Sequence, residues 1–365
     1  MRDPVLIIGG GLAGLTAARL LRASGIDLQL HEARSRLGGR ILTSDESGRP
    51  SADGFDLGPS WFWPGMQASM AALVKELGLP TFAQNSDGDV VFQRMSRESP
   101  QRYRGMRQEP ESMRLAGGTS ALITAMAPAL GAERVHLESR LTHLVLREDA
   151  VEATFAQPHA AATVRASHVI LALPPRLLAA TVSFAPAVDA ATLARWQSTP
   201  TWMAPHAKFF AVYERPFWRE AGLSGTAQSM VGPLVEIHDA TTASGQAALF
   251  GFVGVPPAQR KTMGQDTIVS AALRQLVTFF GPDASAPRAT LFKDWAADEL
   301  TATDADLTDS THPAPSDRPW IVGIWRERIS LAGSETSATE PGYLAGAVTA
   351  AERAAADLRR RLGTT

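Results

Sequence analysis

The clearest pattern of apolar and polar positions lies in the first forty residues. Residues 5–8 are four apolar residues in a row, rich in β-branched side chains and too short for a buried helix. This run predicts a strand buried on both faces. A predicted helix follows and ends at Gly25, and its small and apolar positions recur at helical spacing: Gly14, Ala17, Ala18 and Leu21. A second strand is predicted over 27–31 and ends at Glu32.

The glycines between the first strand and the helix have the spacing G-x-G-x-x-G. Gly9 permits a tight turn, Gly11 lets the backbone approach a pyrophosphate, and Gly14 lets the helix pack closely on the sheet. The helix N-terminus directs unpaired N–H groups at the phosphates. Glu32 is placed to accept hydrogen bonds from ribose hydroxyls, and this acid argues against NADP. The segment therefore predicts a dinucleotide-binding unit.

The rest of the chain mixes helical and strand patterns. Helices are predicted over 66–79, 120–130 and 266–280, and a last helix begins at 342. Strands are predicted over 135–137, 141–147, 151–155, 166–173, 207–213, 248–255 and 329–333. Residues 81–114 are predicted to be irregular and polar, with a candidate hairpin among them. The acidic, proline-rich segment 294–319 predicts a long loop, which we expect to lie over the active site.

Length and composition limit the class of protein. A chain of 365 residues suits two lobes, and its 45% hydrophobic and 20% charged residues indicate a folded protein. The net charge of −2 gives no general attraction for nucleic acid, so no nucleic-acid partner is expected. The longest apolar stretch, 247–255, has nine residues and is too short to span a bilayer. Because the first strand begins at Val5, we expect no signal peptide and a cytoplasmic protein.

Several kinds of chemistry are excluded. The chain contains no cysteine, so it has no disulfide, thiolate metal site, cysteine nucleophile or flavin attached through a cysteine sulfur. Its eight histidines show no metal-ligand spacing, and no metal is expected. The motifs G-x-x-x-x-G-K, G-x-S-x-G and H-E-x-x-H are also absent from the sequence.

A second glycine loop favours FAD over NAD. Gly38 and Gly39 let the chain pass close to a pyrophosphate, while Arg40 is predicted to neutralise it in bidentate fashion. NAD enzymes with this fold do not need such a loop. Together with Glu32-Ala33-Arg34, the segment resembles the N-terminal signature of the flavin-containing amine oxidase family. The resemblance implies FAD as the cofactor.

A second match to the family lies near the C-terminus. It consists of Gly333, Ser334, Glu335, Thr336, Gly342 and Tyr343. In physical terms it is again a strand, a glycine-rich turn and a helix N-terminus aimed at negative charge. In the family this helix start lies against the flavin, so the resemblance implies that these residues bind the cofactor. It implies further FAD contacts at Gly58, Pro59, Ser60, Val135 and Trp295.

The resemblance also implies an α/β fold with two interleaved lobes. The Rossmann-type FAD-binding lobe would comprise residues 1–79, 115–198 and 294–365. The α+β substrate-binding lobe would comprise residues 80–114 and 199–293.

The family match suggests three catalytic residues, Trp61, Lys208 and Tyr343. Trp61 would line the substrate cavity, although a loop anchored by aromatic packing is an alternative. Lys208 would hold a water at flavin N5. It could instead be an edge-strand lysine that reaches water, with Lys293 as its rival for the functional role. Tyr343 would be an aromatic wall that polarises a neutral amine, whereas a tyrosine at a helix start is also compatible with a structural role.

The sequence departs from the family in one region. Members with covalent flavin have a cysteine and a second cage tyrosine shortly after the tryptophan that Trp295 matches, and residues 301–305 contain neither. FAD is therefore expected to be noncovalent. The aromatic cage is incomplete unless Trp61 or Trp63 supplies the wall opposite Tyr343.

The expected reaction is oxidation of a small-molecule amine to an imine, with hydride transfer to flavin N5 and reoxidation by oxygen to hydrogen peroxide. Two alternatives remain open, because one fold hosts many reactions. They are an FAD-dependent desaturase or isomerase of an isoprenoid or porphyrinogen-like substrate, and a non-catalytic FAD-binding protein. An amino-acid oxidase is a nearer variant that needs an arginine for the carboxylate. The sequence specifies neither the substrate nor the oligomeric state.

Overall fold

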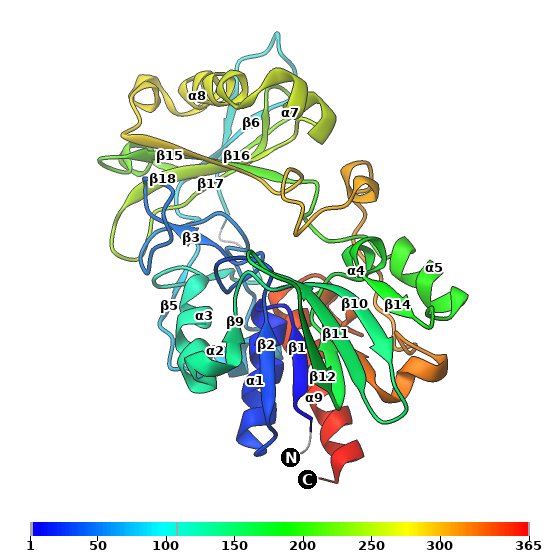
Figure 1. The fold of residues 1–365 in the computed structure, drawn as a ribbon. Coiled ribbons are helices and arrows are strands. Elements are labelled where there is room, and N and C mark those ends of the chain that lie inside the picture. Colours follow the sequence, from blue (N-terminus) through cyan, green and yellow to red (C-terminus); the bar gives the residue numbers. More distant parts are fainter. Residues whose placement is uncertain (1–2, 107–108, 364–365) are drawn as a thin grey trace. The chain divides into compact units, whose positions relative to one another are not determined.

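A computed structural model of the protein describes residues 3–106 and 109–363. The chain divides into two compact units. The first unit comprises Met1–Arg40, Leu122–Trp202 and Glu299–Thr365, and the second comprises Ile41–Ala121 and Met203–Asp298. Figure 1 colours their elements along the chain.

The first unit is built on a parallel sheet of five strands (Figure 1). In spatial order they are β20 (Ile329–Leu331), β13 (His168–Leu171), β1 (Val5–Ile8), β2 (Leu28–His31) and β9 (Val135–His136). Helix α1 (Leu12–Ala23) connects β1 to β2 and packs along α9 (Leu344–Leu362). Every residue of β1 is buried, as the unbroken apolar run predicts. The strand, helix and second strand predicted for the first forty residues are thus confirmed.

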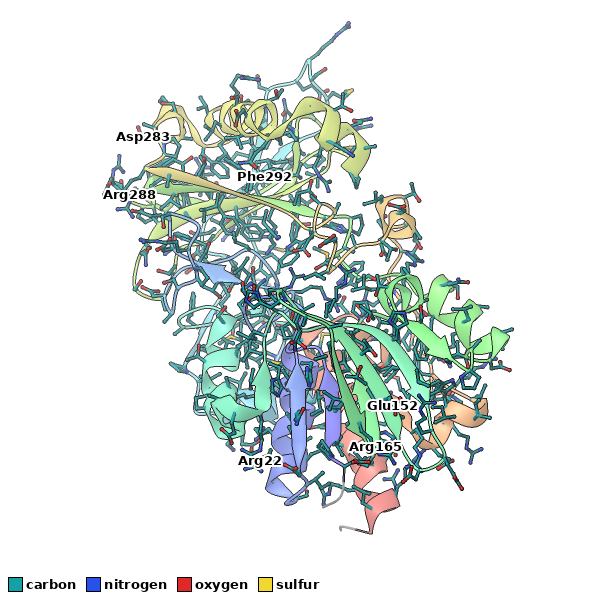
Figure 2. All side chains as sticks on the ribbon, viewed as in Figure 1. Arg22, Glu152, Arg165, Asp283, Arg288 and Phe292 are labelled. Atoms are coloured by element: carbon teal, nitrogen blue, oxygen red, sulfur yellow. The ribbon has the colours of Figure 1, made fainter. Side chains whose placement is uncertain are left out.

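A second sheet of the first unit has the strand order β12 (Ala162–Ala166), β11 (Val151–Ala156), β10 (Arg140–Leu146) and β14 (Ser183–Ala185). Its apolar face packs with Leu178 of α4 (Pro175–Thr181) and Trp196 of α5 (Ala190–Ser198). Glu152 and Arg165 are opposite each other on neighbouring strands and carry charge at the outer face (Figure 2). The alternation of apolar and charged residues therefore places the core on one side of this sheet.

The buried strand predicted over 166–173 is confirmed as β13, but its predicted start is too early because two sheets share this segment. Ala166 ends β12 in the antiparallel sheet, whereas His168 begins β13 in the parallel sheet. Ser167 lies at the crossing and donates its N–H to the carbonyl of Pro4 at 3.0 Å. The residues on both sides of the crossing are buried, so the apolar run gives no sign of the break.

The second unit is built on a mixed sheet of seven strands. In spatial order they are β19 (Ala289–Asp294), β15 (Ala207–Tyr213), β18 (Ala247–Val253), β17 (Leu234–Asp239), β16 (Leu223–Ser229), β6 (Asp89–Gln93) and β7 (Gln101–Tyr103). Phe209 of β15 packs in the cluster formed with α8 (Gln265–Phe280), while Phe210 packs in a second cluster with Phe55 and Leu57. Because side chains alternate along a strand, Lys208 lies on the same face as Phe210.

The remaining elements are short. The helices are α2 (Ala68–Glu76), α3 (Ser120–Met126), α6 (Phe217–Glu220) and α7 (Pro257–Met263). Two small sheets pair β3 (Thr43–Ser44) with β4 (Phe55–Asp56), and β5 (Thr81–Ala83) with β8 (Met113–Leu115). The predicted helices over 66–79 and 120–130 are confirmed with shorter bounds, and the one over 266–280 is confirmed with one more residue at its start. In the described ranges, no helix has the length and apolar character needed to cross a membrane.

The candidate hairpin within residues 81–114 is confirmed, but the prediction that the rest of this segment is irregular is wrong. Strands β5, β6, β7 and β8 all lie in this segment, and β6 and β7 form an edge hairpin of the large sheet. β6 pairs in parallel with β16, more than a hundred residues away in the chain. A strand whose partner is so distant leaves little local pattern, so the sequence did not predict the pairing of β6 with β16.

Residues 199–202, predicted in the substrate-binding lobe, belong to the first unit. The opposite difference covers residues 41–79, 115–121 and 294–298. Predicted as part of the FAD-binding lobe, these residues group by their contacts with the second unit. The reason is packing, because Phe55 and Leu57 belong to the apolar cluster on the sheet face that carries Phe210. Which ligand each unit binds stays a prediction.

Candidate functional site

The first glycine loop is shaped by close backbone contacts. Gly9 has φ +105°, and a methyl group there would lie 2.7 Å from the carbonyl oxygen of Ala172. A methyl group at Gly14 would collide with the carbonyl oxygen of Gly9. Around Gly11, by contrast, a methyl group would meet nothing closer than the Gly38 oxygen at 3.7 Å. Gly9 and Gly14 are thus required by packing, whereas a methyl group at Gly11 would make only ordinary contact with the second glycine loop.

The second glycine loop lies directly beside the first. Gly38 donates its N–H to the Gly10 carbonyl at 2.8 Å, and Gly38 and Gly11 form an isolated parallel bridge. Glu32 links the two loops, because its Oε2 accepts the N–H of Gly10 at 2.7 Å and its Oε1 accepts the N–H of Arg34 at 2.8 Å. This linking role of Glu32 adds to the ribose contact that its spacing predicts, which stays a prediction.

Arg40 joins the two family motifs. Its Nη1 lies 2.6 Å from Glu335 Oε1 and its Nη2 lies 3.1 Å from Glu335 Oε2. Nη2 also donates to Ser334 Oγ at 3.0 Å, and Nη1 to the Trp202 carbonyl at 3.2 Å. The bidentate fork of Arg40 therefore holds a buried carboxylate in this structure. Its predicted contact with a pyrophosphate stays a prediction.

The first unit fits a dinucleotide. Helix α1 begins at Gly11, and among the described residues no side chain caps its first turn and no acid lies in it. Its N–H groups and positive dipole end are therefore open to phosphate oxygens. Glu32 donates its N–H to the carbonyl of His136 at 2.9 Å, and Val135 pairs with Leu30, so the FAD contact predicted at Val135 lies beside the end of β2. The residues that would hold FAD here are the two glycine loops, Glu32 and β9.

The C-terminal motif brings three rings together. After β20 come Gly333, the 3₁₀ turn η6 (Ser334–Thr336), and Gly342, and Tyr343 is the N-cap of α9. The ring centroid of Tyr343 lies 6.4 Å from that of Trp202 and 5.2 Å from that of His312. Trp202 and His312 are 4.5 Å apart in an edge-on arrangement. Neither neighbour of Tyr343 was predicted from the sequence.

Lys208 is buried in the second unit and fully hydrogen-bonded. Its Nζ donates to the carbonyls of Asp56 at 3.2 Å and Gly58 at 2.6 Å, and to Ser60 Oγ at 2.9 Å. The side chain is 4% exposed, and burial lowers the pKa of Lys208 from 10.5 to about 7. The structure thereby brings Lys208 together with Gly58 and Ser60, which were predicted independently as site residues. It does not support the alternative of an edge-strand lysine that reaches water.

Trp61 lies beside Lys208. The centroid of its ring is 5.9 Å from Lys208 Nζ, 5.4 Å from the ring of Phe250 and 4.8 Å from that of His238. Its Nε1 donates to Gln84 Oε1 at 2.8 Å. Trp61 is therefore held by both packing and a hydrogen bond on the sheet face that carries Lys208.

Lys293, the rival of Lys208, is its direct cross-strand neighbour on β19. Its Nζ pairs with Asp298 at 3.0 Å and lies 4.4 Å from the ring centroid of Trp295. Trp295 is buried and donates its Nε1 to the carbonyl of Leu57 at 2.9 Å. An ion pair satisfies Lys293, whereas Lys208 is held by uncharged acceptors at a lowered pKa. This difference favours Lys208 as the functional lysine.

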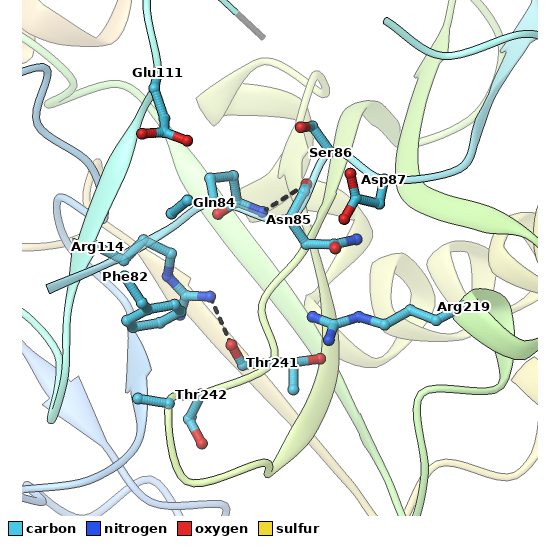
Figure 3. Close-up of a pocket in the computed structure, with 12 residues that line it drawn as sticks. Phe82, Gln84, Asn85, Ser86, Asp87, Glu111, Arg114, Arg219, Thr241 and Thr242 are labelled. Atoms are coloured by element: carbon cyan, nitrogen blue, oxygen red, sulfur yellow. Dashed lines mark hydrogen bonds between the residues drawn. The ribbon is translucent and has the colours of Figure 1, made fainter. Parts of the chain in front are cut away.

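A polar pocket of about 310 Å³ lies in the second unit close to Trp61 (Figure 3). Gln84 lines it, and the same side chain accepts from Trp61 and donates to the Asp239 carbonyl at 2.8 Å. Arg114 also lines it, and its Nη1 donates to the Thr241 carbonyl at 2.8 Å. Arg114 is buried near Asp56. The sequence analysis predicted neither this buried arginine nor the pocket that it lines. The described residues contain no cluster of acids and histidines that could hold a metal ion.

These features define a class of protein, one with a dinucleotide-binding α/β unit and a second unit carrying a buried lysine among aromatic rings. The model of the flavin-containing amine oxidoreductase family matches residues 12–111 and 98–359. The chain therefore belongs to this family and is a flavin-dependent amine oxidase.

Known proteins resemble the chain over nearly its whole length. A Mycobacterium tuberculosis (strain ATCC 25618 / H37Rv) protein provisionally named flavin-containing monoamine oxidase AofH is 26% identical over 461 residues, covering 97% of this chain and 96% of that protein. Wild-type putrescine oxidase bound to putrescine has a TM-score of 0.80 at 23% identity, covering 99% of this chain and 100% of that one. Cyclohexylamine oxidase from Brevibacterium oxydans IH-35A has a TM-score of 0.79 at 21% identity, with both chains fully covered. These structures confirm the predicted two-domain fold.

Proposed function

We propose that the protein oxidises a small-molecule amine to an imine with FAD bound noncovalently and oxygen as the acceptor. The observation that carries the proposal is the environment of Lys208, whose Nζ lies 2.6 Å from the Gly58 carbonyl and 5.9 Å from the Trp61 ring centroid. A buried amine with a pKa of about 7 can hold or release a proton at neutral pH.

A bound FAD supplies the redox chemistry, which is acceptance of a hydride equivalent from the carbon next to the amine nitrogen and delivery of the electrons to oxygen. The chain supplies position and electrostatics. Lys208 holds a proton at Nζ, and the rings of Trp61, Phe250 and Phe252 keep its surroundings dry. Tyr343 presents an aromatic face that suits an amine nitrogen.

The chain contains no cysteine, so FAD cannot be attached through a cysteine sulfur. We therefore propose that FAD is bound noncovalently. The proposal predicts that acid precipitation of the purified protein releases the yellow flavin into the supernatant. A flavin that stays with the precipitated protein would show a link to another side chain and contradict this part of the proposal.

The main test is the visible spectrum under anaerobic conditions. The purified protein should bleach when the right amine is added, and putrescine, cyclohexylamine and a panel of monoamines represent the substrates named for its relatives. Readmitted oxygen should restore the spectrum and yield hydrogen peroxide. A flavin that stays oxidised with every amine would favour the desaturase or the binding protein. No flavin, even after FAD is added, would contradict the interpretation of residues 5–40.

A further inference from the structure

Three rings from distant parts of the first unit form one cluster, Trp202, His312 and Tyr343. Trp202 follows α5, His312 lies in the proline-rich loop before η5 (Gly323–Glu327), and Tyr343 starts α9. Centroid separations are 4.5 Å between Trp202 and His312 and 5.2 Å between His312 and Tyr343. The sequence lacks the second cage tyrosine and offers Trp61 or Trp63 in its place, whereas within the first unit the structure puts Trp202 and His312 beside Tyr343.

The cluster is built into the fold on the side of Trp202. Gly342 has φ +83°, and a methyl group on it would lie 2.6 Å from Trp202 Cβ. Trp202 therefore packs directly against the backbone that precedes Tyr343, and a larger residue at position 342 would push it away. The Trp202 carbonyl also accepts from Arg40 Nη1 at 3.2 Å, which ties the cluster to both family motifs.

The loop that carries His312 is anchored at its base. Arg176 is nearly buried and reaches Asp306 Oδ1 at 2.7 Å and Asp309 Oδ2 at 2.9 Å. Asp309 in turn accepts the N–H of Thr311 at 3.0 Å. The residue before His312 is thus held by a chain of charged hydrogen bonds, so the imidazole occupies a defined position beside Tyr343.

His312 carries an unused polar atom. Its Nε2 is buried and has no hydrogen-bond partner among the residues that the structure describes. A buried nitrogen without a partner costs free energy, and it is commonly satisfied by a ligand or a water. Two aromatic neighbours make the same place favourable for an amine or ammonium group. An imidazole nitrogen can either donate to an amine nitrogen or accept from it, depending on the tautomer.

We propose that His312 binds the substrate nitrogen beside Tyr343, with Trp202 as the ring that positions the imidazole. This inference rests on the proposed function and names the residue that recognises the amine. Where family members have a second tyrosine in the cage, this chain would use a ring with a hydrogen-bonding nitrogen. The substrate class is then a small amine whose nitrogen either donates an N–H to His312 Nε2 or accepts one from it, according to the tautomer.

The test compares His312→Phe, which keeps a ring but removes both nitrogens, with His312→Gln, which keeps a hydrogen-bonding group. The matched control is His143→Phe, because His143 is exposed on β10 of the same unit. In anaerobic titrations of flavin reduction, His312→Phe should weaken apparent amine binding by about tenfold, the value of one hydrogen bond. His312→Gln should recover most of this loss, and His143→Phe should bind as the wild type does.

A second readout does not depend on turnover. In protein with ¹⁵N-labelled histidine, the ring nitrogen signal that His312→Gln removes should shift when the amine is added. If the wild-type flavin bleaches but His312→Phe binds amine normally and the signal does not move, the inference is overturned and the proposed function stands. If no amine bleaches the flavin, the proposed function fails. In that case the ¹⁵N signal of the His312 ring tests the inference by itself. A shift on adding amine supports an amine site at His312, and an unmoved signal overturns the inference.

Discussion

Arg40 and Glu335 are 295 residues apart in the chain and form a two-pronged ion pair, with N–O distances of 2.6 and 3.1 Å. The Glu335 side chain is completely buried, whereas Arg40 is 27% exposed. The pair fastens the glycine loop after β2 to the turn before α9. The two segments that identify the family are therefore also each other's structural support.

Removing one partner of this pair should be costly. Arg40→Met leaves a buried carboxylate without its cation, and we expect a loss of about 3 kcal/mol in the free energy of unfolding. Denaturant unfolding of the apoprotein measures it. The double variant Arg40→Met/Glu335→Gln should recover part of the loss, and Arg49→Met, at an exposed pair with Asp45, should leave stability unchanged. A double variant no better than the single one would show that the pairing is not the cause.

Gly14→Ala should impair both stability and FAD binding. The added methyl group collides with the carbonyl oxygen of Gly9, so α1 must move away from the first glycine loop. We expect a cost of about 1–3 kcal/mol. Gly65→Ala is the matched control, because its methyl group would meet nothing within 4 Å, and it should change stability by less than about 0.5 kcal/mol. Equal effects of the two substitutions would contradict the close packing at Gly14.

Lys208 should make stability rise with pH above neutrality. Burial lowers its pKa from 10.5 to about 7, so between these values the unfolded chain holds a proton that the folded chain has released. Stability then increases with pH by up to about 1.4 kcal/mol per unit for this group. Lys208→Met removes this contribution to the pH dependence of the unfolding free energy. The difference in unfolding free energy between wild type and variant should change across this window, and a constant difference would contradict the lowered pKa.

Ser60 should matter through Lys208. Its hydroxyl accepts from Nζ at 2.9 Å, and it can donate instead once Nζ has lost a proton. Ser60→Ala should cost about 1–3 kcal/mol because a buried ammonium loses one of three acceptors. In a double-mutant cycle with Lys208→Met the two effects should not add, since they share one contact. Strict additivity would show that Ser60 acts elsewhere.

Sequence patterns predicted the parts of the structure that are formed by residues close together in the chain. The unit from β1 to β2 and the glycine loops follow from neighbouring residues, and the structure has them where the spacing places them. Lys208 was identified, but its acceptors lie about 150 residues away in the chain, as the separations of 152, 150 and 148 show. Nothing near position 208 in the sequence indicates them.

The missed features share this origin. The pairing of β6 with β16 joins segments that are far apart in sequence, and so does the ring cluster at Tyr343. His312 sits in a proline-rich loop with no periodicity, so its approach to Tyr343 arises from tertiary packing alone. The anchoring of that loop by Arg176 is equally invisible, because the arginine and its acids are 130 and 133 residues apart.

Glu32 gives the nucleotide site its shape before any nucleotide arrives. Its two oxygens already hold Gly10 of one loop and Arg34 of the next, at 2.7 and 2.8 Å. The entropy of ordering both loops is therefore lost when the chain folds rather than when the cofactor binds. Such preorganisation implies that flavin-free protein keeps a receptive site and regains its colour by simple mixing with FAD.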